Sequence, residues 1–274
     1  IKSSLLYSVT TMHTLFNITN TMILIWFIPQ IEKIVSWIIP QKAEKEVFRL
    51  KYIQGGPLST AELSLDEAEQ EIVHFSEICY NGFGYMRQAI NEKDPVKFGE
   101  LREKLIKYEA ITDRIEYEIA DYLNEVYKGE ISSSSAVRIN GMYKIIGELE
   151  SIGDSGDAIG RILARRNEHG LSFDEQQLKR LGRMCDLLDD AFKALTNNLK
   201  VPYTSLKDIT NAQDAEYNIN ECRNTLREEH IINIEENSSY NYQVGVFYMD
   251  IVAELEKMGD FMINVSEAKI AENG

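Results

Sequence analysis

The sequence predicts an all-α protein, in which an N-terminal membrane helix precedes two antiparallel three-helix bundles. From Ala61 onward, apolar residues recur at helical spacing, and the alternation typical of strands is absent. Short breaks separate six long segments, which favours antiparallel packing of neighbouring helices. An acidic motif recurs at an offset of 106 residues, which indicates that one three-helix unit is duplicated.

The first element is a mostly apolar segment, residues 5–28, which would reach about 36 Å as a helix and could cross a bilayer. His13, Asn17 and Asn20 lie on one face of this helix, and polar stripes in membrane spans usually face a bundle interior or a water-filled path. A buried helix of a soluble core is the alternative. Because the chain begins at Ile1 without Met, we interpret it as a piece of a longer protein.

The next element is a short apolar segment, residues 31–39, which ends at Pro40 and is typical of an interfacial helix. Basic residues follow it, and such residues beside a span prefer the cytoplasmic side. We therefore expect residues 1–40 to hold the last membrane helix and the interfacial helix, and 41–57 to be a basic linker. Residues after about 41 would then lie in the cytoplasm; the resemblance described below implies that the membrane is the cell inner membrane. The basic residues are Lys42, Lys45, Arg49 and Lys51.

The remaining pattern predicts six helices, over residues 61–90, 95–128, 135–167, 173–200, 205–233 and 239–271. Ser59 or Thr60 is expected to cap the first helix, and Ser172 the fourth. The first bundle would span residues 58–168 and the second 169–274.

Composition limits the classes of partner. The net charge is −15, from 44 acidic and 29 basic residues. Such a chain repels phosphate backbones, so no nucleic-acid partner is expected, whereas carboxylates in this excess suit hard cations. The three cysteines are far apart and form no C-x-x-C arrangement. A disulfide framework or zinc knuckle is therefore not predicted, and buried cysteines are.

The repeated motif places acidic residues four apart. Residues 148–154 and 254–260 agree at five of seven positions. An earlier pair, Glu109 and Asp113, corresponds to Glu216 and Asn220 at an offset of 107. Carboxylates at this spacing share a helix face and repel by roughly 0.2 to 0.5 kcal/mol. They are either solvated or compensated by a cation between facing helices.

If the second and third predicted helices lie side by side, four carboxylates converge on an oxygen-rich site suited to Mg²⁺, Mn²⁺, Ca²⁺ or iron. These are Glu109, Asp113, Glu150 and Asp154. Gly153 and Gly259 precede the last aspartate of each motif, where a mid-helix glycine costs roughly 1 kcal/mol relative to alanine. A metal cluster and a tight helix crossing would each explain them.

These residues resemble the PhoU family, phosphate-signalling regulators built from two three-helix bundles that bear Glu/Asp-x-x-x-Asp metal motifs. Residues 58–68 resemble the beginning of PhoU-like domains attached to transporters. His13-Thr-Leu-Phe-Asn17 and the span after it resemble the last membrane helix of bacterial sodium-dependent phosphate cotransporters. The resemblance implies metal ligands Glu109, Asp113, Glu150 and Asp154 in the first unit, and Glu216, Glu256 and Asp260 in the second. Asn220 departs from the pattern, which implies a weaker or vestigial second cluster.

The resemblance implies the C-terminal part of a sodium/phosphate cotransporter, whose cytoplasmic domain regulates phosphate transport or signalling with bound divalent metal or iron. Its expected partners are the membrane, phosphate and sodium through the preceding portion, and a regulatory protein. The alternative is a membrane-tethered interaction module without metal or transport. We expect no enzyme, because a ferritin-like di-metal site needs two Glu-x-x-His pairs and only Glu71 and His74 have that spacing.

Overall fold

The computed structural model describes residues 10–22, 50–203, 205–236 and 240–271, and every regular element among them is a helix. The chain divides into two compact units, residues 1–49 and 50–274. In the first unit, residues 10–22 form a helix. None of the helices in the described ranges has both the length and the apolarity that crossing a membrane requires. The predicted span over 5–28 is therefore not supported by its described part. Both its ends, and the predicted interfacial helix, lie outside the described residues.

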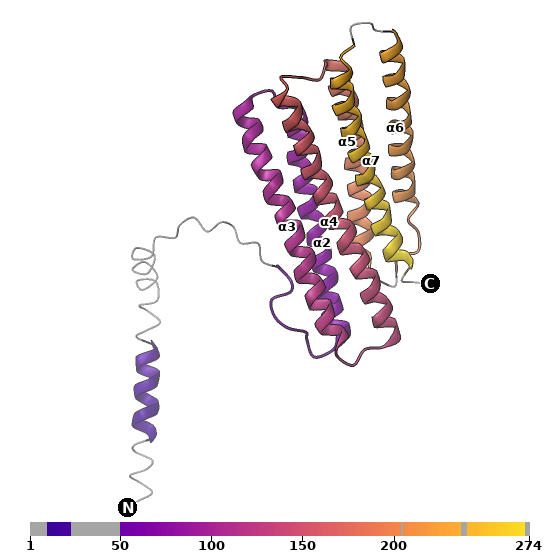
Figure 1. Ribbon diagram of the computed structural model, residues 1–274. Helices are drawn as coiled ribbons and strands as arrows, with labels where there is room; N and C mark the ends of the chain where they lie inside the picture. Colours follow the sequence, from indigo (N-terminus) through magenta and orange to yellow (C-terminus); the bar gives the residue numbers. More distant parts are fainter. Residues whose placement is uncertain (1–9, 23–49, 204, 237–239, 272–274) are drawn as a thin grey trace, which may run out of the picture. The chain divides into compact units, whose positions relative to one another are not determined.

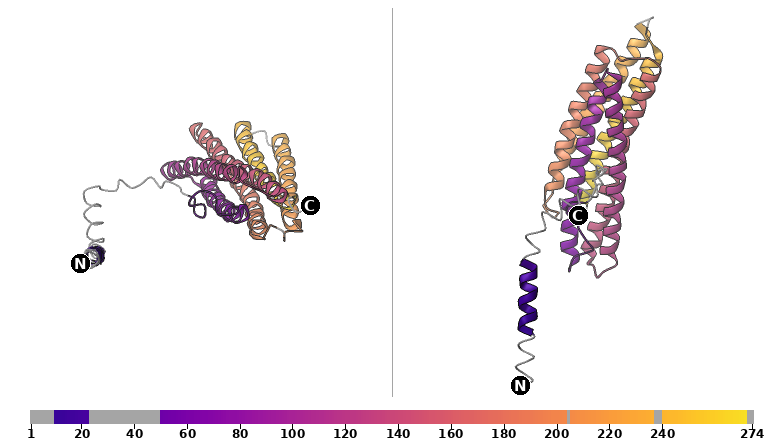
Figure 2. Two further views of the ribbon diagram at one scale, coloured as in Figure 1. Left: turned by 90° about the horizontal axis from the view of Figure 1, so that it is seen from below. Right: turned by 90° about the vertical axis from the view of Figure 1, so that its left-hand side faces the viewer.

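The second unit consists of six long helices that run alongside one another (Figures 1 and 2). Helices α2, α3 and α4 pack together, as do α5, α6 and α7. The two groups meet through α4 against α7 and α2 against α5, so that equivalent helices of the repeat face each other. Helices α3 and α6 lie at opposite edges (Figure 1). The bounds are α2 Ala61–Asn91, α3 Pro95–Tyr127, α4 Ser133–Glu168, α5 Glu175–Lys200, α6 Thr210–Glu236 and α7 Tyr242–Ala271.

All six predicted helices are present, and two of their starts need correction. Ser172 does not cap α5, because Asp174 accepts a hydrogen bond from Gln177 N at 2.7 Å and forms a reciprocal capping box. Helix α6 begins at Thr210 instead of residue 205. At this start the Asp208 side chain accepts a hydrogen bond from Thr210 N at 2.9 Å. In both cases the side chain of a nearby aspartate accepts a hydrogen bond from a backbone N–H at the start of the helix.

The core is built from the apolar stripes of the helices. Leu65, Ile115 and Leu255 are fully buried, and burying such a side chain contributes about 1.5 to 3 kcal/mol. As predicted, the cysteines are buried and unpaired. Burial raises the pKa of Cys185 to about 12, which keeps this thiol protonated and unreactive.

Glu71 has a structural role at the start of this unit. Its fully buried carboxylate accepts hydrogen bonds from the backbone N–H groups of Tyr52, at 2.6 Å, and Ile53, at 3.3 Å. Its other oxygen lies 3.1 Å from Nδ1 of His74. The single Glu-x-x-His pair therefore anchors the incoming chain to α2.

Candidate metal centre

The acidic residues of the first unit lie at a close crossing of α3 and α4. Thr112 of α3 is buried against Gly153 of α4, and a Cβ at position 153 would lie 2.3 Å from Thr112 Oγ1. The duplicated helices repeat this contact, since a Cβ at Gly259 would lie 2.9 Å from Ile219 Cδ1. Both glycines are therefore explained by a tight helix crossing, which brings the acidic residues of the two helices together.

The first acidic cluster comprises Glu109, Asp113, Glu150 and Asp154. One carboxylate oxygen from each of Glu109, Asp113 and Asp154 lies within 4.8 Å of the other two. Glu150 stays outside this group, one turn before Asp154 on α4. Asp113 and Asp154 are exposed, whereas Glu109 and Glu150 are half-buried. The cluster is therefore open to solvent on one side.

Burial and mutual repulsion disfavour the ionised form of these carboxyl groups. Burial, followed by the charges of Asp154 and Asp113, raises the pKa of Glu150 to about 7. Burial and then Asp113 likewise raise the pKa of Glu109 and of Asp154. Glu116 of α3 also contributes to the shift at Glu150. The cluster thus contains negative charge that a bound cation would stabilise.

A neighbouring ion-pair network limits this negative charge at one end. Asp157, which is buried, accepts hydrogen bonds from both Arg102 and Arg161. Arg161 in turn lowers the pKa of Glu109 and of Asp154, although burial and the acidic neighbours outweigh it. Its guanidinium therefore compensates only part of the charge.

The second cluster, Glu216, Asn220, Glu256 and Asp260, is organised differently. Arg223 donates to the Glu256 carboxylate, and Asn220 Nδ2 donates to Glu216. Burial raises the pKa of Asp260 and Arg223 opposes that shift. Within the described part of the chain, only the first cluster groups three carboxylates at metal-binding distance. The second cluster already contains its own cation.

Charge reversal at one position separates the two clusters. At the 107-residue offset of the repeat, Glu116 of the first unit corresponds to Arg223 of the second. The same offset relates Glu109 and Asp113 to Glu216 and Asn220, but the arginine three residues beyond Asn220 was not predicted as part of the site. An all-carboxylate oxygen set fits a hard cation such as Mg²⁺, Mn²⁺ or Ca²⁺, and the first cluster provides one. The second does not, because the amide of Asn220 replaces one of its four carboxylates and Arg223 is paired with another, Glu256.

Comparisons with known proteins agree with this architecture. Residues 72–163 match the family described as PhoU domain, and this segment contains the whole first cluster. The solved structure of the phosphate transport system regulatory protein PhoU from Streptococcus pneumoniae has a TM-score of 0.61 at 17% identity. The match covers 78% of this chain and 96% of that one. PhoU from Pseudomonas aeruginosa has a TM-score of 0.59 at 16% identity, over 77% and 97% of the chains.

A search of curated proteins found no match. Residues 72–163 nevertheless match the PhoU domain, and the fold is PhoU-like, as the sequence resemblance predicted.

Proposed function

We propose that this protein regulates phosphate transport through its PhoU-like helices and that the first acidic cluster binds a divalent metal or iron ion. The observation that carries the proposal is the convergence of Glu109, Asp113 and Asp154 inside the segment that matches the PhoU domain. The similar solved structures are named as PhoU, one of them as a phosphate transport system regulator, which supports a role of this class.

A cation at the first cluster would neutralise the repelling carboxylates and stabilise the α3–α4 crossing. Because Asp113 and Asp154 are exposed, an ion held there would face solvent and keep coordination positions for other oxygen ligands. A strongly anionic surface needs such a cation to hold an anion. The bound ion would therefore give phosphate, or a regulatory partner's carboxylate, a point of attachment.

Metal analysis of the full chain, purified without chelator, tests this proposal. We expect bound metal in the wild type and its loss in the Glu150→Ala, Asp154→Ala double variant. The matched control is Glu256→Ala with Asp260→Ala, which removes the equivalent carboxylates of the second cluster and should retain the metal. Equal metal content in the two double variants would contradict the proposal.

We further propose that the chain is the C-terminal part of a sodium/phosphate cotransporter at the inner membrane, with residues after about 41 in the cytoplasm. The polar stripe of residues 13–20 and the basic flank that ends near Lys51 support this context from the sequence. Uptake of phosphate into vesicles by the full-length protein is the direct test. A protein that shows no sodium-dependent uptake would exclude the transporter context.

The alternative is a membrane-tethered interaction module that uses no metal. One observation favours this alternative. Three large apolar side chains are exposed near the end of α6, those of Ile231, Ile232 and Ile234. Such residues mark contact surfaces for other proteins when they gather in one patch. In this case metal analysis would find no bound metal, because the acidic clusters would be solvated instead.

A further inference from the structure

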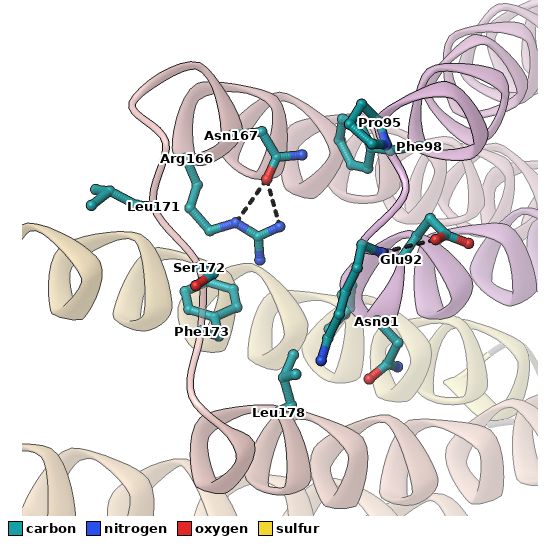
Figure 3. A pocket seen from close by; sticks show the side chains of 12 residues that line it. Asn91, Glu92, Pro95, Phe98, Arg166, Asn167, Leu171, Ser172, Phe173 and Leu178 are labelled. Atoms are coloured by element: carbon teal, nitrogen blue, oxygen red, sulfur yellow. Dashed lines mark hydrogen bonds between the residues drawn. The ribbon is translucent and has the colours of Figure 1, made fainter.

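A cavity of about 490 Å³ lies in the second unit, and its lining includes no residue of either acidic cluster. Figure 3 shows the side chains that line it. The α2–α3 connection forms one side of it, and the α4–α5 connection and the first turn of α5 form the other. A volume of this size is in the range of small-molecule sites. Its apolar wall is formed by Ile90, Pro95, Phe98, Leu171, Phe173 and Leu178.

The cavity contains a buried arginine without an acidic partner. Arg166, at the end of α4, is only 5% exposed. Its Nε and Nη2 atoms donate to Asn167 Oδ1 at 3.1 and 2.7 Å, and its Cζ lies 4.5 Å from the ring centroid of Phe173. Among the described residues, no carboxylate lies within ion-pair distance of this guanidinium. Burial lowers the pKa of Arg166, and no acidic neighbour raises it.

Arg138, which is also buried in the described part of the chain, has the acidic partners that Arg166 lacks. Arg138 is 9% exposed, and its Nη2 atom lies 2.7 Å from Asp66 and 3.1 Å from Glu69. A buried charge is costly unless an opposite charge and hydrogen bonds compensate it. The amide oxygen of Asn167 supplies only part of that compensation at Arg166.

The local backbone holds Arg166 in place. Helix α4 ends in a Schellman motif, in which Leu171 N donates to Arg166 O at 3.1 Å and Gly170 N donates to Asn167 O at 2.9 Å. Gly170 has a φ of 66°, the left-handed conformation that this motif requires. Asn167 occupies one edge of the guanidinium, while the remaining edge points toward the cavity (Figure 3). The group is thus preorganised for one more acceptor.

We propose that this cavity binds a small organic monocarboxylate, whose carboxylate pairs with Arg166 and whose apolar body packs between Phe98, Phe173 and Leu178. The charges at the margin favour a monoanion, because Lys93 and Glu92 also line the cavity and offset each other. The apolar wall favours an aliphatic or aromatic body over a free phosphate dianion. This site is independent of the first acidic cluster and of metal binding.

The test measures binding of phenylacetate and of its neutral isostere phenylacetamide to the full chain by calorimetry. Charge-assisted hydrogen bonds from Arg166 should make phenylacetate bind at least ~10-fold more tightly. Arg166→Gln should abolish this preference, with circular dichroism verifying that the variant folds. Arg165→Gln, at an exposed arginine of the same helix, should keep it.

Several results would overturn the proposal. Equal affinity for the acid and the amide in the wild type, or no binding of either at about 10 mM, would show that the cavity does not select a carboxylate. The same holds if Arg166→Gln retains the preference. Displacement of phenylacetate by an equal concentration of inorganic phosphate would show that the monocarboxylate assignment is wrong.

Discussion

The pKa of Glu150 reports how far burial and the neighbouring carboxylates together disfavour an ionised carboxylate in the first acidic cluster. Burial and then the charges of Asp154 and Asp113 raise its pKa from 4.5 to about 7. Between these values the folded protein retains a proton that the unfolded chain releases. Stability should therefore fall as the pH rises from about 4.5 to about 7. A pKa difference of this size corresponds to about 3 kcal/mol, which solvent screening of a half-buried group reduces to about 1–2 kcal/mol.

The perturbation is Glu150→Gln, which removes the ionisation and keeps the size of the side chain. Urea unfolding with chelator present, followed by circular dichroism at intervals from about pH 5 to about pH 8, gives the free energy of unfolding. The variant should match the wild type at the acidic end and be about 1–2 kcal/mol more stable at the alkaline end. Glu103→Gln, at an exposed carboxylate of α3 outside the cluster, should follow the wild-type pH dependence.

Metal should reverse this order, because a cation compensates the charge that the variant removes. With free metal at about 100 times its dissociation constant, the wild type should gain about 2.7 kcal/mol, and Glu150→Gln should gain less. A variant that is less stable than the wild type at about pH 8 without metal would refute the reasoning. So would a variant whose stability falls with pH as steeply as that of the wild type.

Two further predictions concern the helix crossing and the charge reversal. Gly153→Ala should destabilise the protein by about 1–3 kcal/mol in urea unfolding, because its Cβ would overlap Thr112 Oγ1. Gly147→Ala on the same helix, where nothing lies within 4 Å, should stabilise it by up to about 1 kcal/mol, and equal midpoints would contradict this explanation. Arg223→Glu combined with Asn220→Asp should raise the metal content per chain, and an unchanged content would argue against arginine as the feature that separates the clusters.

The helices of the second unit were predictable because their signals are local. Apolar spacing, proline at the start of α3 and glycine after α4 each act within a turn or two of the chain. The errors were local as well. Asp174 replaced Ser172 as the cap of α5, since two acceptors close to a helix start compete and sequence reading alone did not rank them.

The first acidic cluster was predictable in part. The repeat and the four-residue spacing placed Glu109 and Asp113 on one face and Asp154 on a facing helix, and the structure brings these three together. Glu150 shares the spacing but lies outside their group. The distance between its carboxylate and the carboxylate oxygens of those three residues depends on how α3 and α4 are rotated about their axes. Spacing within one helix does not determine that rotation.

By itself, the sequence determined the all-helical class of the described residues, the duplication and the acidic character of the motifs. Only the tertiary structure decided which features became sites. It showed that Gly153 accommodates Thr112, that Arg223 turns toward Glu256, and that Arg166 is buried without an acid. Each of these depends on contacts between segments far apart in the chain, whereas periodicity reports only on neighbours within one helix.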